Sequence, residues 1–307
     1  MQQTDIIDAV GLGYTKVWEE RGYLLRLAAV PALVKLICLV IVFSTDHMHD
    51  FLRQTLIMLP AHFLEGWLLA QFLRTLLCGE RWPIKVDTER EDHILFMMRR
   101  ARGIISAVLI YVLIKMGLGA VMAAGDYAHQ QAREKQAQLA GNTAPEPGKT
   151  GSSATKADTT QSTTPGEAAS DLPATIGPEA AIPAIVLVIM LIWAFRYLWL
   201  YIPAAVNMPL TAFANRMGGF MTSLRLLGAW MIAVTPVLLI GVMITSIMLG
   251  SYNGQLDQAP SFVSFLILCM NVIVELLVAI IATAAIAIAL RHLMPPDQSD
   301  IPPAHYA

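Results

Sequence analysis

Residues 109–121 read LIYVLIKMGLGAV, an apolar run with one lysine, Lys115, near its middle. The run belongs to a longer apolar stretch, and about 20 such residues in a helix cross the hydrocarbon of a bilayer. An ammonium group is expensive to place at that depth unless other polar groups surround it. The stretch therefore predicts a membrane-spanning helix and raises the question of which groups lie around Lys115.

The composition of the whole chain favours a membrane protein. Of its 307 residues, 56% are hydrophobic and 14% are charged; a soluble domain usually carries about 25% charged residues. The mean hydropathy is +0.56. The formal net charge of −2 excludes the basic footprint of a nucleic-acid-binding protein. The lipid bilayer is thus the first expected partner, and no nucleic acid is expected.

Six apolar stretches are long enough to cross a bilayer, near 24–43, 54–78, 104–125, 182–202, 226–250 and 261–290. Because lipid cannot satisfy open backbone groups, each is expected to be a helix. The predicted fold class is an all-α integral membrane protein with six transmembrane helices. No cleavable signal peptide is expected, since the first 23 residues lack a continuous apolar core. Pro31, Pro60 and Pro236 lie inside spans and predict kinks.

Basic residues in the loops predict the orientation. The 79–103 loop holds six Lys and Arg residues, whereas the 44–52 and 251–260 loops hold none. The positive-inside rule then places both termini in the cytoplasm. The resulting division of the chain is a cytoplasmic interfacial helix (1–23), three spans (24–125) with a cytoplasmic amphipathic loop (79–103), an extracytoplasmic segment (126–181), three more spans (182–291) and a cytoplasmic tail (292–307).

The extracytoplasmic segment has two parts. GDYAHQQAREKQAQLA (125–140) is rich in helix formers and predicts a polar stalk that continues the third span. The Ser/Thr/Pro/Gly/Ala-rich remainder has too few large apolar residues to order itself, so a disordered linker is expected. The alternative is a segment that binds a partner or carries glycans.

Three spans are preceded by an amphipathic segment on the cytoplasmic side. RGYLLRLAAVPALVKL (21–36) and RGIISAVLIYVLIKM (102–116) both begin with Arg-Gly and reach a lysine, and GGFMTSLRLLGAWMIAVTP (218–236) keeps the glycine without the lysine. The pattern suggests three copies of one unit, an interfacial helix followed by a transmembrane hairpin. The alternative is that any span with basic flanks looks alike.

The stretch RYLWLYIPAAVNMPLTAFANRMGGFMTSLRLLGAW (196–230) combines an Arg-led span ending in IPAAV, a short amphipathic segment and a Leu-rich re-entry. Together with the six-span layout, it resembles a group of uncharacterised bacterial six-span proteins similar to the membrane domain of glycerophosphoryl diester phosphodiesterases. The resemblance covers about 35 residues, and no catalytic domain accompanies it. It implies a bacterial cytoplasmic (inner) membrane protein and transfers no phosphodiesterase chemistry.

Four ionisable residues lie at similar depth in four different spans. They are Lys35, Glu65, Lys115 and Glu275. Such residues usually face the bundle interior and pair with one another. In one interpretation the pairs hold the bundle together; in the other, Glu65 or Glu275 couples to a proton or cation, with a lysine tuning its pKa. His62, one turn before Glu65, is a candidate proton relay or a simple hydrogen-bonding partner. Arg74 and Arg196, near the cytoplasmic ends, are expected to reach the headgroups.

No metal or other cofactor is predicted. The loop STDHMHD (44–50) offers zinc-type ligands, but a short hairpin loop rarely brings three or four together, so a solvated turn is the default expectation. The weak candidates for ligands are Asp46, His47, His49 and Asp50. Cys38, Cys78 and Cys269 all lie in apolar runs and are expected to be small buried hydrophobes.

The motifs leave two classes of function open. No GxSxG, Walker A or HExxH motif occurs, so an enzyme is not expected. The first class is a non-catalytic assembly, lipid-organising or envelope-maintenance factor, with a membrane protein or a second copy as its partner. The alternative is a small secondary transporter or permease that uses the mid-membrane Glu and Lys residues for ion coupling; it needs a discontinuous helix or polar cavity at mid-depth.

Overall fold

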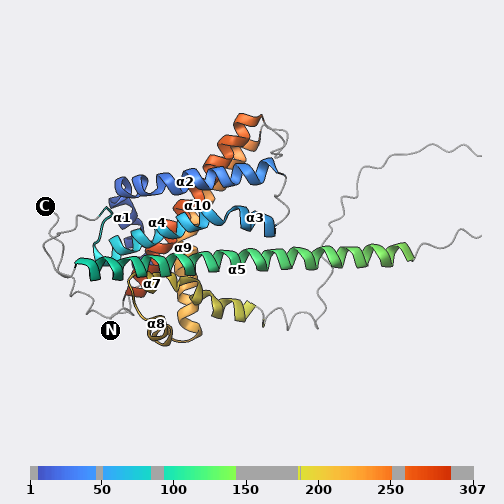
Figure 1. Cartoon of the computed structure of the whole chain (residues 1–307). Coiled ribbons are helices and arrows are strands. Elements are labelled where there is room, and N and C mark those ends of the chain that lie inside the picture. Colours follow the sequence, from blue (N-terminus) through green and yellow to red (C-terminus); the bar gives the residue numbers. More distant parts are fainter. Residues whose placement is uncertain are drawn as a thin grey trace, which may run out of the picture. The chain divides into compact units, whose positions relative to one another are not determined.

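The computed structural model of the chain describes residues 6–45, 51–83, 93–142, 186, 188–250 and 260–291. Every regular element within those ranges is a helix, which confirms the predicted all-α class (Figure 1). The chain divides into two compact units, one made of Met1–Ala123 with Ile189–Ala307 and the other of Ala124–Val188. The candidate site lies in the first unit.

The described part of the chain contains the following helices in order. They are α1 (Ile6–Glu19), α2 (Arg21–Ser44), α3 (Phe51–Ile57), α4 (Leu59–Cys78), α5 (His93–Asn142), the short 3₁₀ helix η1 (Phe195–Trp199), α7 (Tyr201–Ala205), α8 (Leu210–Arg216), α9 (Phe220–Gly250) and α10 (Ser261–Leu290). Figure 1 shows α2, α4 and the first half of α5 running alongside one another, with α10 crossing them.

Five helical segments in the described part of the chain are long and apolar enough to cross a membrane. They are Arg21–Ser44, His93–Gly125, Val188–Ala205, Phe220–Gly250 and Ser261–Leu290. A sixth is added if α3 and α4, which are bent by 58° at their junction, count as one broken span. The apolar stretches identified from the sequence are thus found as helices, and the number of spans is five or up to six.

The second predicted span is not one continuous helix. A single helix over 54–78 is wrong, because α3 ends at Ile57 and α4 begins at Leu59. Pro60 stands in the first turn of α4, where its missing N–H costs no intrahelical hydrogen bond. Proline at that place starts a new helix instead of kinking an existing one, whereas Pro31 and Pro236 lie inside the continuous helices α2 and α9.

The third span begins earlier than its hydropathy indicates. The sequence predicts a cytoplasmic loop over 79–103 and a span from 104, but α5 is already helical at His93 and continues for 50 residues to Asn142. The amphipathic residues from His93 onward therefore form the first turns of the candidate spanning helix and not a separate interfacial helix. The polar stalk expected after the span is helical as far as Asn142, and the predicted linker at 143–181 lies outside the described residues.

The N-terminal helix α1 is packed more deeply than a helix lying only among headgroups. Its residues Ala9, Val10 and Gly13 are buried, and a Cβ on Gly13 would lie 3.0 Å from the backbone of Ala285 in α10. The Tyr14 hydroxyl donates to the Ala233 carbonyl in α9 over 2.6 Å. Burial raises the pKa of Tyr14, so this hydroxyl stays protonated as a donor. The predicted lipid face is split, with part of it holding α1 against α9 and α10.

Polar contacts tie the start of α2 to the end of α4. Glu20 pairs with Arg81 over 2.6 Å, and the backbone N–H of Trp82 donates to the Tyr23 hydroxyl over 3.1 Å. These contacts place the first residue of α2 and the last residue of α4 at the same end of the unit.

Further contacts bring other helix ends to this same end. The Asn207 side chain, just after α7, donates to the Arg99 carbonyl in α5 over 2.7 Å. Arg74 of α4 donates to the carbonyl of Ala205, the last residue of α7, over 2.7 Å. Near the end of α10, Thr283 lies 2.8 Å from the hydroxyl of Tyr201 in α7. The starts of α2 and α5 and the ends of α4, α7 and α10 therefore meet.

Gly103 sits where α5 passes the end of α7, and we expect its replacement to be costly. A Cβ there would lie 2.9 Å from the carbonyl oxygen of Ala205. Gly103→Ala should lower the free energy of unfolding by about 1–3 kcal/mol, as other overpacked sites do. Gly117→Ala in the same helix meets nothing within 4 Å and should raise stability by about 0.5–1 kcal/mol. Thermal unfolding in detergent measures both, and equal shifts would contradict the close approach.

Candidate functional site

The four charged residues expected at similar depth meet in one cluster, defined here as the ion-pair cluster. The Lys35 ammonium (α2) lies 3.0 Å from Glu65 Oε2 (α4) and 2.8 Å from Glu275 Oε1 (α10). The Lys115 ammonium (α5) lies 3.7 Å from the same Glu275 oxygen. Four helices that are far apart in the sequence thus share one set of ion pairs.

The cluster is centred on Lys35 and not on Lys115. The side chains of Lys35 and Glu65 are each 1% exposed, whereas those of Lys115 and Glu275 are 27% and 37% exposed. Lys35 bridges two carboxylates, and Lys115 makes one longer contact at the edge. The position of each residue along its span did not distinguish the four residues. The rotation of each helix about its axis decides which side chain is innermost.

A glycine lets α5 approach the cluster. Gly66 follows Glu65, and a Cβ there would lie 3.2 Å from the ring of Tyr111 and 3.4 Å from the backbone of Val108. The absence of a side chain brings Tyr111 of α5 against α4, and one turn later the Lys115 ammonium lies 5.7 Å from the Tyr111 ring centroid. Glu65 therefore supplies a charge to the cluster, and Gly66 leaves the space in which α5 packs against α4.

His62 lies beside the ion-pair cluster but forms no hydrogen bond with its members. It is one turn before Glu65 on α4, and its Nδ1 is 3.9 Å from Glu65 Oε2, which is longer than a hydrogen bond. His62 Nδ1 and Glu65 Oε1 are both buried with no hydrogen-bond partner among the described residues. Both residues belong to the first turns after the break between α3 and α4, and whether His62 relays protons or only forms a hydrogen bond stays a prediction.

A second buried polar network, which was not predicted from the sequence, joins α4 to the start of α5. Arg74 donates to Glu80 through Nε at 2.8 Å and Nη2 at 2.9 Å. Arg100 donates to Glu80 at 2.6 Å and to the Gln71 side chain at 2.7 Å. We call these four residues the arginine clamp. Arg74 is 3% exposed, so the expectation that it reaches the headgroups is wrong.

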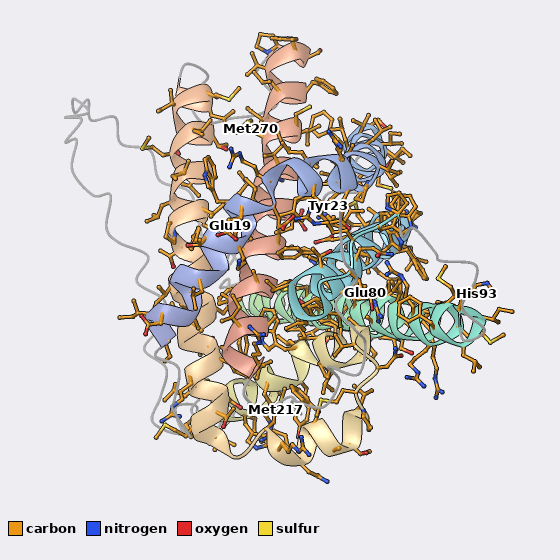
Figure 2. The ribbon with its side chains drawn as sticks, turned by 90° about the vertical axis from the view of Figure 1, so that its left-hand side faces the viewer. Glu19, Tyr23, Glu80, His93, Met217 and Met270 are labelled. Carbon is orange, nitrogen blue, oxygen red and sulfur yellow. The ribbon has the colours of Figure 1, made fainter. Side chains whose placement is uncertain are left out.

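The turn after α4 positions the acid of the clamp. Gly79 has φ of 70°, in the left-handed region that glycine adopts without strain. Its N–H donates to the Thr75 carbonyl and the Glu80 N–H donates to the Arg74 carbonyl, a common helix ending. This turn folds Glu80 back onto Arg74. Figure 2 shows Glu80 beside the first turns of α5. The sequence pattern that could have predicted this network is Gln71 and Arg74, one helical turn apart, followed by Gly79-Glu80.

Arg196 is also more buried than expected. It is 8% exposed, and its guanidinium lies 4.5 Å from the ring centroid of Trp193 and 4.8 Å from that of Tyr197. It donates to the Gly218 carbonyl before α9. The expectation that it reaches the headgroups is wrong, because aromatic faces and a carbonyl hold the guanidinium within the protein.

The remaining candidate residues do not form a site in the described part of the chain. The candidate metal ligands Asp46, His47, His49 and Asp50 lie outside the described residues. Within the described ranges, no group of three or more His, Cys, Asp or Glu side chains could hold a metal ion. Cys38 is buried, and Cys78 and Cys269 are half-buried; all three are free thiols.

A hollow of about 270 Å³ lies beside the arginine clamp, with Gln71, Trp82 and Arg100 in its lining. None of the four members of the ion-pair cluster lines it. Comparisons add no further assignment, since no family model, no curated protein and no solved structure matches the chain. The chemistry of the two polar networks is therefore the basis for a functional proposal.

Proposed function

We propose that the chain is a multi-pass protein of the bacterial cytoplasmic membrane with a non-catalytic role in assembly, lipid organisation or envelope maintenance. The observation that carries this proposal is the ion-pair cluster, in which two lysines and two glutamates join four helices with no net charge. Ion pairs between charges that balance fix the positions of helices relative to one another, as a scaffold requires. The resemblance of residues 196–230 to six-span bacterial membrane proteins supports the same cellular location.

The proposed topology has six spans and both termini in the cytoplasm. Support comes from the helix ends that meet at Arg81, Arg99 and Ala205. When successive spans alternate in direction, the first and third spans begin on the side of the membrane where the second and fourth spans end. The described basic residues of the 79–103 segment, Arg81, Arg99, Arg100 and Arg102, belong to that end, as the positive-inside rule requires of a cytoplasmic side. A reporter that is active only in the cytoplasm should be active when fused at residue 307 and inactive when inserted at residue 150; the reverse pattern would contradict the topology.

The threefold repeat stays a proposal, with one feature for it and one against it. The helix α1 precedes α2, and the short helix α8 precedes α9, as an interfacial helix before each hairpin would. The start of α5 departs from this unit because it is continuous with the span.

The scaffold role makes a prediction about flux. Protein purified into proteoliposomes should not dissipate an imposed pH gradient faster than empty vesicles, measured with a trapped pH-sensitive dye. Native mass spectrometry of the same preparation should retain a lipid or a partner polypeptide in fixed ratio. Proton or solute flux above that of empty vesicles would contradict a purely structural role.

An ion-coupled transporter is the second candidate, and the broken helix favours it. The 58° bend between α3 and α4 is the discontinuity that such a mechanism needs. His62 Nδ1 and Glu65 Oε1, which have no hydrogen-bond partner in the described part of the chain, lie in the first turns after the break. If flux is found, Glu65→Gln should abolish it while Glu19→Gln, in an exposed pair with Lys16, leaves it unchanged.

A further inference from the structure

The ion-pair cluster has one side that the described part of the chain leaves uncovered. The side chains of Lys115 and Glu275 are 27% and 37% exposed, in contrast to 1% for Lys35 and Glu65. Asn271 is also exposed, and it lies one helical turn before Glu275 on the same side of α10. Three polar side chains therefore emerge together from the middle of two candidate spans.

Apolar surface continues from these polar groups along α5. Leu118 and Met122 follow Lys115 at helical spacing and are 47% and 63% exposed. One and two turns earlier, Tyr111 and Val108 on that side are 6% and 9% exposed. Beyond Lys115, α3 covers only part of this side of α5: Thr55 packs at Gly119, whereas Leu118 and Met122 stay exposed among the described residues.

Contact of this surface with lipid hydrocarbon is energetically unfavourable. Within a bilayer, exposed amide and charged groups have no water to bond, so such side chains face a protein interior, a cavity or another helix. Amide side chains of this kind form hydrogen bonds between helices in membranes. The surface therefore calls for an occupant that offers both donors and acceptors.

We propose that Asn271, Glu275 and Lys115, with Leu118 and Met122, form the contact surface for a second copy of this chain. This inference rests on the proposed membrane insertion. The surface is complementary to itself, because the Asn271 amide both donates and accepts, and Lys115 and Glu275 carry opposite charges. A twofold contact repeats the same patch on both partners. Asn271 then bonds to its symmetry mate, and each Lys115 reaches the partner's carboxylate on the exposed side.

A cross-linking experiment tests the contact at one position. Cys38, Cys78 and Cys269 are replaced by Ala in the full chain, and Asn271→Cys is introduced in native membranes. Oxidation should give a disulfide-linked dimer of this chain. The matched control is Ile273→Cys, which is 48% exposed and lies about 200° around the helix from position 271 at nearly the same depth; it should stay monomeric. Unmodified protein in nanodiscs should have twice the chain mass, and Asn271→Leu should lower the dimer fraction at least tenfold.

The outcomes separate this inference from the proposal beneath it. Membranes are first washed at alkaline pH; loss of the protein from them overturns membrane insertion, and its retention leaves only the contact in question. Absence of a dimer at position 271, or equal dimers at 271 and 273, overturns the contact surface. Rapid labelling of Asn271→Cys by a membrane-impermeant thiol reagent also overturns it, since that outcome places the surface in a water-filled path.

Discussion

Lys35→Met is expected to lower the free energy of unfolding by about 3–5 kcal/mol, the usual cost of removing one partner from a buried ion pair. The variant leaves the Glu65 carboxylate, 1% exposed, without its cation at 3.0 Å, and it also removes the 2.8 Å contact to Glu275. Unfolding by denaturant in mixed micelles measures the loss. Lys115→Met should lose much less, because that ammonium is 27% exposed and 3.7 Å from its partner.

A double variant separates charge from packing. Lys35→Met with Glu65→Gln removes one charge of each sign and leaves Glu275 with Lys115, so it should recover more than half of the stability lost by Lys35→Met alone. Lys16→Met is the matched control, because it breaks an exposed pair with Glu19 and should change stability by at most about 1 kcal/mol. If Lys35→Met is as stable as the parent, the ion-pair cluster does not stabilise the fold, and that result favours the ion-coupling role.

Glu80→Gln is the second variant with a large expected effect, again about 3–5 kcal/mol. One carboxylate accepts from two nitrogens of Arg74 and one of Arg100; the neutral amide leaves both buried guanidiniums without that anion. The start of α5 should loosen from α4. Cys78, half-buried at the end of α4, then reacts faster with maleimide, and this native thiol reports the change together with the unfolding free energy.

The control for Glu80→Gln is Glu20→Gln. Glu20 pairs with Arg81 at 2.6 Å, but the Arg81 side chain is 57% exposed, so the loss should be at most about 1 kcal/mol. Unchanged Cys78 reactivity in Glu80→Gln would show that the arginine clamp does not hold these helix ends together.

The helical class and the places of the apolar stretches follow from the sequence alone. Hydropathy is a local property, and about 20 apolar residues are helical in lipid whatever their neighbours are. The depth of Lys35, Glu65, Lys115 and Glu275 is local in the same sense, since it depends only on the distance of each residue from the ends of its own span. Their meeting was therefore predictable as a hypothesis of matching depth.

Other features depended on contacts between segments. The break before Leu59 arises from the position of Pro60 in the first turn of a helix, and a proline in an apolar run does not by itself distinguish a break from a kink. The helix α5 begins at His93, so polar residues and the apolar stretch belong to one helix. Hydropathy alone places the start of the helix at the point where the residues become apolar. From its place in the chain, Arg74 is expected at the headgroups, because its partner Glu80 comes from a turn and Arg100, the other donor to Glu80, comes from another helix.

The sequence by itself thus determined that the chain is helical and where its apolar stretches lie, and it predicted which charges share a depth. Only the tertiary structure decided that Lys35 is the centre of the cluster, that Lys115 and Glu275 stand at its open edge, and that a second network joins α4 to α5. The physical reason is that depth depends on position along one helix, whereas partnership depends on how each helix is rotated and which helix lies beside it.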